Sequence, residues 1–145
     1  MGDDAVALVI AEKLRQSLEA KGTKVIIGET DFQYCLNNID ESDYIIILDA
    51  TCFGIEPGFI TIKAIQDIYM INPKQSLFSQ HGYSLITALK DYYSSFDGFV
   101  IGIEGSQFDY TLSLSNELEE QLENICRQVE EILKKVTSSE MQDIY

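Results

Sequence analysis

Four consecutive branched aliphatic residues, Ile45 to Leu48, form the strongest local pattern in this chain. A run that is apolar on both of its alternating sides predicts a strand buried on both faces, as in a parallel sheet covered by helices. The run ends on an acid, Asp49, and a Pro57–Gly58 turn follows. Because ligands of open α/β sheets bind just beyond the carboxyl ends of the strands, Asp49 is a candidate ligand or catalytic group.

The length and charge of the chain narrow its class. It has 145 residues, of which 46% are hydrophobic, and this predicts one globular domain over residues 1–145. The formal net charge is −14. A field of this sign repels phosphate and anionic lipid, so neither nucleic acid nor a membrane is expected as a partner. No apolar run approaches the ~20 residues of a membrane span.

The cysteines and the amino terminus indicate a compartment. Cys35, Cys52 and Cys126 are odd in number and form no CxxC pair, so reduced, mostly buried thiols are expected. The amino-terminal Met-Gly-Asp-Asp is acidic, whereas a secretory signal begins with basic residues. We therefore expect a soluble cytoplasmic protein.

Helix and strand patterns alternate along the chain. Apolar residues at four-residue spacing predict helices, alternation predicts strands, and Gly22 is a stop signal for the first helix. The expected elements are helices at 4–21, 32–39 and 79–93, strands at 23–28, 43–49, 59–65 and 98–105, a loop at 73–80, and a final helix after Ser115.

The last helix has the most regular pattern. Its apolar residues step by four and three, and they are Leu118, Leu122, Ile125, Val129, Ile132 and Val136. Glutamates in its first turn and lysines in its last turn complement the helix dipole. Such a stripe is compatible with a coiled coil, but a helix of this length that docks on a sheet is favoured.

Alternating elements of these lengths predict a three-layer α/β/α sandwich with a mostly parallel twisted sheet. The sequence begins directly on a helix, whereas a doubly wound sheet normally begins with a strand. The first strand is therefore expected to be missing from this sequence, with Met1 an internal methionine of a longer protein, unless the fold tolerates its absence.

Four blocks of the sequence, taken in order, resemble the hydrogenase maturation endopeptidases. "MGDDAVALVIAEKL" is similar to their loop and first helix, and "DYIIILDATCFGIEPG" to their central strand, its terminal aspartate and a Pro-Gly turn. "SQHGYSLITAL" resembles their Ser-x-His segment, and "GFVIGIEG" with the final helix resembles their closing strand and helix. The first strand and Gly-Asn loop of the family are absent here.

The resemblance implies a function and a site. It implies a three-layer α/β endopeptidase of the aspartic type, which removes a carboxyl-terminal peptide from the large-subunit precursor of a nickel–iron hydrogenase after nickel insertion. The family's metal-contacting residues fall on Asp4, Asp49 and His81. They would bind the nickel that the substrate carries, and zinc or cadmium could substitute for it.

The chemistry of these three residues is consistent with that role. Two carboxylates and an imidazole form a mixed oxygen and nitrogen set that suits a divalent ion such as nickel or zinc. Two acids ~5 Å apart repel each other by about 3 kcal/mol at an effective dielectric near 20, and a cation removes that cost. The dipole at a helix start favours the neutral imidazole that binds metal.

Other interpretations compete with this one. Acids at a helix start, such as Asp3 and Asp4, are commonly caps, and a single histidine such as His81 is commonly a surface or cap residue. A non-catalytic metal- or partner-binding module with the same fold is the main alternative function. A flavodoxin-type nucleotide domain is a third, which the negative charge and the absence of a glycine-rich phosphate loop disfavour. HExxH and GxSxG motifs are also absent.

Overall fold

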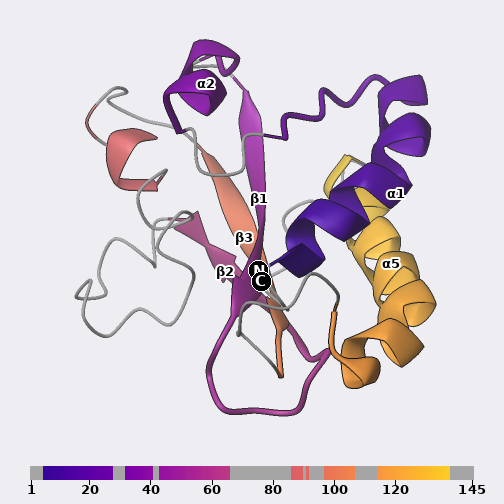
Figure 1. The fold of residues 1–145 in the computed structure, drawn as a ribbon. Helices are drawn as coiled ribbons and strands as arrows, with labels where there is room; N and C mark the ends of the chain where they lie inside the picture. Colours follow the sequence, from indigo (N-terminus) through magenta and orange to yellow (C-terminus); the bar gives the residue numbers. More distant parts are fainter. Residues whose placement is uncertain are drawn as a thin grey trace.

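Three strands form the sheet in the part of the chain that the structure describes. The structure is a computed structural model that describes residues 5–27, 32–40, 43–65, 86–89, 91, 97–106 and 114–137. The strands are β1 (Tyr44–Thr51), β2 (Ile60–Ala64) and β3 (Asp97–Glu104), in the order β1-β3-β2 (Figure 1). β1 runs parallel to β3, and β2 runs antiparallel to it, so the sheet contains one pair of each kind.

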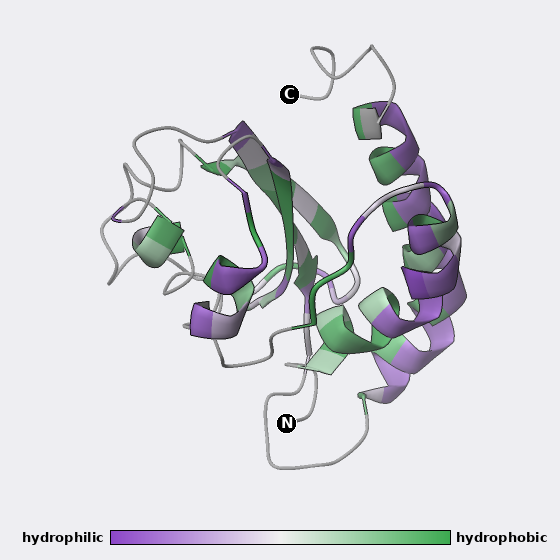
Figure 2. Cartoon of the chain, turned by 90° about the horizontal axis from the view of Figure 1, so that it is seen from above, coloured by the Kyte–Doolittle hydropathy of each residue, from purple (hydrophilic) through white to green (hydrophobic). Residues whose placement is uncertain are grey.

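Two long helices, α1 (Val6–Ala20) and α5 (Asn116–Thr137), cover one face of this sheet. Successive side chains of a strand point to opposite faces, and the set that includes Ala50, Ile101 and Ile103 lies in one buried cluster with residues of both helices. Figures 1 and 2 show the two helices side by side on this face, and Figure 2 shows green apolar residues along their length. The main core therefore lies between these helices and the sheet.

The other face of the sheet packs against the short helix α2 (Phe32–Asn37) and the helical residues 86–89. A second buried cluster joins strand and helical side chains there, and it consists of Leu36, Ile45, Ile47, Ile65, Ile86, Leu89 and Val100. Helical segments therefore lie on both faces of the sheet, and the α/β class predicted from the sequence is confirmed.

The first helix ends as its sequence predicts. Gly22 has a φ of 89°, in the left-handed region that glycine enters without a steric penalty. Its N–H donates to the Glu19 carbonyl at 3.0 Å, and the Thr23 N–H donates to the Leu18 carbonyl at 3.0 Å. These two bonds form a Schellman motif, which satisfies carbonyls that the end of a helix leaves without partners.

The final helix also follows its sequence pattern. Ser115 precedes it, and the Ser115 Oγ accepts a hydrogen bond from the Leu118 N–H at 3.4 Å. Glu117 lies in the first turn and Lys134 in the last, each at the end where the dipole favours its charge. The apolar stripe docks on the sheet and on α1. Of the two interpretations of this stripe, docking on a sheet is therefore the confirmed one.

Most of the other predicted elements are also confirmed. The helix at 32–39 and the strands at 43–49, 59–65 and 98–105 correspond to α2, β1, β2 and β3. The strand predicted at 23–28 is wrong in its described part, because residues 23–27 pair with no strand. An apolar run favours the extended conformation, but a strand also needs a neighbouring strand with which to pair. The predicted loop at 73–80 and the helix start at Ser79 lie outside the described residues.

The cysteines differ from the expectation in their burial. None of the three forms a disulfide, as predicted, but Cys52 is exposed and the other two are half-buried, so none is buried. Cys52 directly follows β1, where the chain leaves the sheet. Burial raises the pKa of the Cys126 thiol, with a smaller lowering by Lys13 and a further small rise from glutamates on α5. Within the described ranges, no helix is long and apolar enough to cross a bilayer.

A tight turn follows the carboxyl end of β1. Gly58 has a φ of 88°, and its N–H donates to the backbone carbonyl of Glu104 at 2.8 Å. The Gln121 side chain of α5 donates through Nε2 to the Pro57 carbonyl at 3.0 Å. A Cβ added at Gly58 would collide with the same Gln121 side chain. The predicted Pro57–Gly58 turn is therefore confirmed, and it is packed against the start of α5.

Truncation of the α5 stripe tests the main core. Ile125 is 1% exposed, so we expect Ile125→Ala to lower the free energy of unfolding by about 2–5 kcal/mol through lost burial and a cavity. Gln128→Ala, at an exposed position of the same helix, is the control and should change it by less than about 0.5 kcal/mol. Urea denaturation measures both, and equal effects would contradict the assignment of this face.

Alanine at two glycines tests the turn after β1. Gly54 and Gly58 both have positive φ, so alanine at either should cost about 1–2 kcal/mol of left-handed strain. Gly58→Ala must also displace Gln121, whereas a Cβ at Gly54 meets nothing within 4 Å. We therefore expect the larger loss of stability for Gly58→Ala. Its excess over Gly54→Ala should shrink when Gln121→Ala is added, and an excess that persists would argue against this contact.

Thiol alkylation tests the environments of the cysteines. Because burial raises the pKa of Cys126, less of its thiolate is present at neutral pH, and the thiolate is the reactive form. Iodoacetamide should therefore modify exposed Cys52 before Cys126 in the folded protein, as peptide mass spectrometry can follow. The difference should disappear in denaturant, which is the control. Faster reaction at Cys126 in the folded state would contradict this ordering.

Candidate active site

Asp49 lies near the carboxyl end of β1, on the face of the sheet that carries Ile45 and Ile47. Its residue is 8% exposed, and its Oδ1 accepts a hydrogen bond from the Ala50 N–H at 2.9 Å. Burying a carboxylate is costly unless polar partners or a cation compensate it. Asp49 thus lies near the carboxyl end of its strand, as predicted, but the prediction that this strand is the central one is wrong for the described sheet, where β3 lies between β1 and β2.

The strand positions beside Asp49 carry little side-chain bulk. In the sheet register Asp49 pairs with Gly102 of β3, and Gly102 pairs with Thr61 of β2. Residues paired in register point to the same face, so this row runs from a carboxylate across a glycine to a small hydroxyl. The β3 position directly opposite Asp49 therefore carries no side chain.

The other two predicted ligands, Asp4 and His81, lie outside the described residues. Asp4 directly precedes Ala5, the N-cap residue of α1, which makes no side-chain cap hydrogen bond. Within the described ranges, no group of three or more histidine, cysteine, aspartate and glutamate side chains is placed to hold a metal ion. The convergence of Asp4, Asp49 and His81 on one ion thus stays a prediction.

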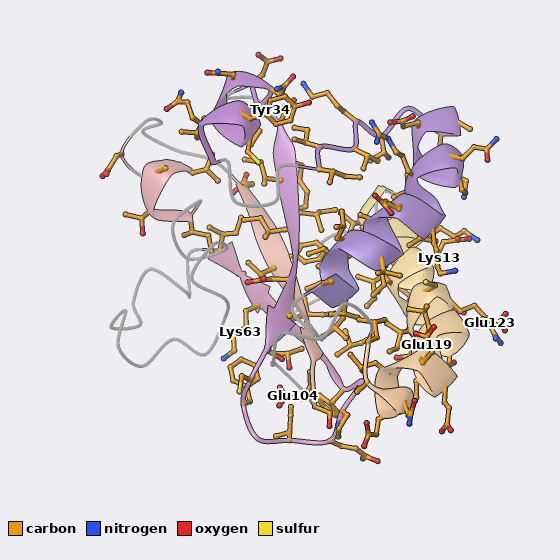
Figure 3. The ribbon with its side chains drawn as sticks, in the orientation of Figure 1. Lys13, Tyr34, Lys63, Glu104, Glu119 and Glu123 are labelled. Atoms are coloured by element: carbon orange, nitrogen blue, oxygen red, sulfur yellow. The ribbon has the colours of Figure 1, made fainter. Side chains whose placement is uncertain are left out.

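A second buried acid, Glu104, lies at the carboxyl end of β3 and is 1% exposed. Its Oε1 accepts hydrogen bonds from the Thr51 hydroxyl at 2.8 Å and the Phe53 N–H at 2.9 Å. Its Oε2 accepts from the Gly54 N–H at 2.9 Å and the Ile55 N–H at 3.3 Å. Figure 3 shows Glu104 at the end of the sheet from which the loop after β1 departs. We call residues 51–55 the β1 loop.

Sequence reasoning missed Glu104, although its signal is the one that identified Asp49. Both acids follow a largely apolar run, and both therefore require polar partners when they are buried. The run before Glu104 is broken by Gly98 and Gly102, which draw attention to packing instead.

Two exposed apolar side chains lie near this end of the sheet. Ile55 in the β1 loop is 42% exposed, and Phe59, just before β2, is 56% exposed. A third, Ile62 in the middle of β2, is 37% exposed. Scattered exposed apolar residues are normal on protein surfaces, so these three carry no functional assignment by themselves.

Comparisons with known proteins identify relatives of this chain. Residues 8–134 match the family model described as "HycI: Hydrogenase maturation protease". No sequence among the curated proteins matches significantly. Among solved structures, the [NiFe] hydrogenase maturation protease HybD from Thermococcus kodakarensis has 24% identity and a TM-score of 0.69, covering 91% of this chain and 90% of that one.

Two further structures agree in fold. The hydrogenase maturating endopeptidase HybD from E. coli has 20% identity and a TM-score of 0.71, over 94% of this chain and 87% of that one. The maturation protease HycI from Thermococcus kodakarensis KOD1 has 21% identity and a TM-score of 0.63, over 92% and 85%. The family model spans most of the chain. This protein therefore belongs to the hydrogenase maturation protease family and is a peptidase.

Proposed function

We propose that this protein removes the carboxyl-terminal extension from the large subunit of a nickel–iron hydrogenase after nickel has been inserted. The observation that carries the proposal is the position of Asp49, a buried carboxylate near the carboxyl end of β1 in a member of this peptidase family. Open α/β sheets bind their ligands at that end of their strands. The partner is the hydrogenase large-subunit precursor, and the reaction takes place in the cytoplasm.

In this proposal Asp4, Asp49 and His81 together recognise the nickel that the precursor carries. Carboxylate oxygens and a neutral imidazole nitrogen are suitable ligands for that ion. The protein needs no metal of its own for this step, and zinc or cadmium would occupy the same ligands as substitutes. Recognition of the nickel would also select precursors that are already loaded.

The topology favours one place where these ligands can meet. Asp49 lies on the face of the sheet that α2 covers, near the carboxyl end of β1. In this proposal Asp4 and His81 meet Asp49 over the carboxyl-terminal edge of the sheet. That edge is where the β1 loop begins and where open α/β sheets bind their ligands.

The proposed role of the site is to hold the scissile bond at a fixed place. Once the nickel is bound, the precursor segment that extends from the nickel site is held close to the two carboxylates. Confinement of the reacting groups lowers the activation barrier, because their translational and rotational entropy is lost when the substrate binds and not when the transition state forms. If these carboxylates assist the hydrolysis and no serine or cysteine acts as the nucleophile, the peptidase is of the aspartic type.

Substitution of the ligands tests this function. Incubation of the protein with nickel-loaded precursor should shorten the precursor, as intact mass spectrometry can detect. We expect Asp49→Asn and His81→Ala to lower the cleavage rate by about 10²-fold or more, because a misplaced substrate loses the benefit of confinement. Glu120→Gln, which removes an exposed carboxylate on α5, is the matched control and should cleave normally.

Two results would contradict the proposal. One is full processing of the precursor by His81→Ala or Asp49→Asn with a normal fold by circular dichroism. The other is tight binding of the nickel-loaded precursor by the wild-type protein without any loss of mass, which would favour a non-catalytic binding module.

A further inference from the structure

We propose that Glu104 is a positioning residue for the cleavage reaction, because its carboxylate fixes the β1 loop beside Asp49. The inference rests on the proposed function and deepens it. Glu104 would not touch the substrate. It would act through the backbone of the loop that borders Asp49 at the carboxyl end of β1.

Each of the two carboxylate oxygens of Glu104 accepts two hydrogen bonds. Oε1 takes the Thr51 hydroxyl and the Phe53 N–H, and Oε2 takes the Gly54 and Ile55 N–H groups, at 2.8–3.3 Å. Three consecutive backbone amides that converge on one carboxylate make an anion-binding nest within the protein itself. Hydrogen bonds to a charged acceptor are stronger than neutral ones, so the carboxylate is a strong organiser of these residues.

The sheet register places this arrangement directly beside Asp49. Thr51 pairs with Glu104, and two residues earlier Asp49 pairs with Gly102. Residues two apart on a strand share a face, so Asp49, Thr51 and Glu104 all point to the same side of the sheet. The residues that Glu104 holds are therefore Thr51, two positions after Asp49 on β1, and residues 53–55 of the loop that follows.

The backbone N–H groups of residues 53–55 lie outside any helix or strand, and the Glu104 carboxylate is their acceptor. Residues 52–55 belong to no helix or strand, and Gly54 has a φ of 79°, a conformation that turns successive amides toward one acceptor. The backbone of Glu104 adds bonds around the side chain, accepting from Gly58 and donating to Phe59. The next residue, Gly105, donates to the Thr51 carbonyl.

A glutamine cannot replace this carboxylate. Glutamine has a single acceptor oxygen, and its amide nitrogen is a donor. In Glu104→Gln one pair of donors would keep its acceptor, while the other pair would face N–H groups. The shape of the side chain is preserved, so the variant removes the acceptor function with little change in packing.

Two measurements on Glu104→Gln test the proposal. Amide hydrogen exchange of residues 53–55 should accelerate about ten- to hundredfold, as lost hydrogen bonds to a charged group imply. With nickel-loaded precursor, kcat should fall about 10²-fold with little change in KM, because the loop would no longer hold the geometry beside Asp49. Thr51→Val, which removes one donor, should show smaller changes of the same kind, and Thr51→Ser should restore the wild-type values.

A matched control distinguishes the proposed positioning role of Glu104 from a role in stability alone. Ile125→Val or Ile125→Ala, whichever matches the loss of unfolding free energy of Glu104→Gln, destabilises α5 without contacting the β1 loop. We expect the matched variant to keep its kcat and its exchange at residues 53–55. The Thr51 pair carries the test if Glu104→Gln does not fold.

Three outcomes would overturn the proposal. The first is a wild-type kcat in Glu104→Gln or, if that variant does not fold, in Thr51→Val. The second is an equal loss of kcat in the matched Ile125 variant. The third is unchanged amide exchange at residues 53–55. If the wild-type protein itself leaves the precursor intact, the proposed function fails. The exchange experiment still decides in that case whether Glu104 organises the loop.

Discussion

The parallel pairing of β1 with β3 is the interaction on which the arrangement at the candidate site depends. Its register sets Asp49 beside Gly102 and Thr51 beside Glu104. Side chains alternate along a strand, so a slip of one residue would turn Glu104 to the opposite face and leave the β1 loop without its acceptor. The same slip would place a large side chain next to Asp49.

Local sequence features hold this register in place. An added Cβ at Gly98 would collide with the backbone carbonyl of Ile45, so a glycine is needed at this position of β3. Separate apolar clusters then bury the two faces of the sheet, one under α1 and α5 and the other under α2 and residues 86–89. Each face has its own set of alternating residues, and both sets oppose a change of register.

Sequence patterns predicted the elements well where local physics decides them. Gly22 ends α1 through its positive φ, and Ser115 begins α5 through its side-chain oxygen. The strand predicted from residue 23 was wrong because strand formation depends on a neighbour that the sequence does not reveal. Asp49 was predicted as a site residue because an acid at the end of a buried run requires an explanation. Glu104 satisfies the same criterion and was overlooked.

The sequence by itself determined the alternating helices and strands, the buried run of β1 and the acid near its carboxyl end, because these follow from periodicity and from the cost of burying charge. The tertiary structure alone decided what Glu104 meets. The donors to Glu104 come from residues about 50 positions earlier in the chain, and no local pattern encodes which backbone amides will lie across a sheet. That pairing is set by the register of two strands, which folding establishes through the whole core.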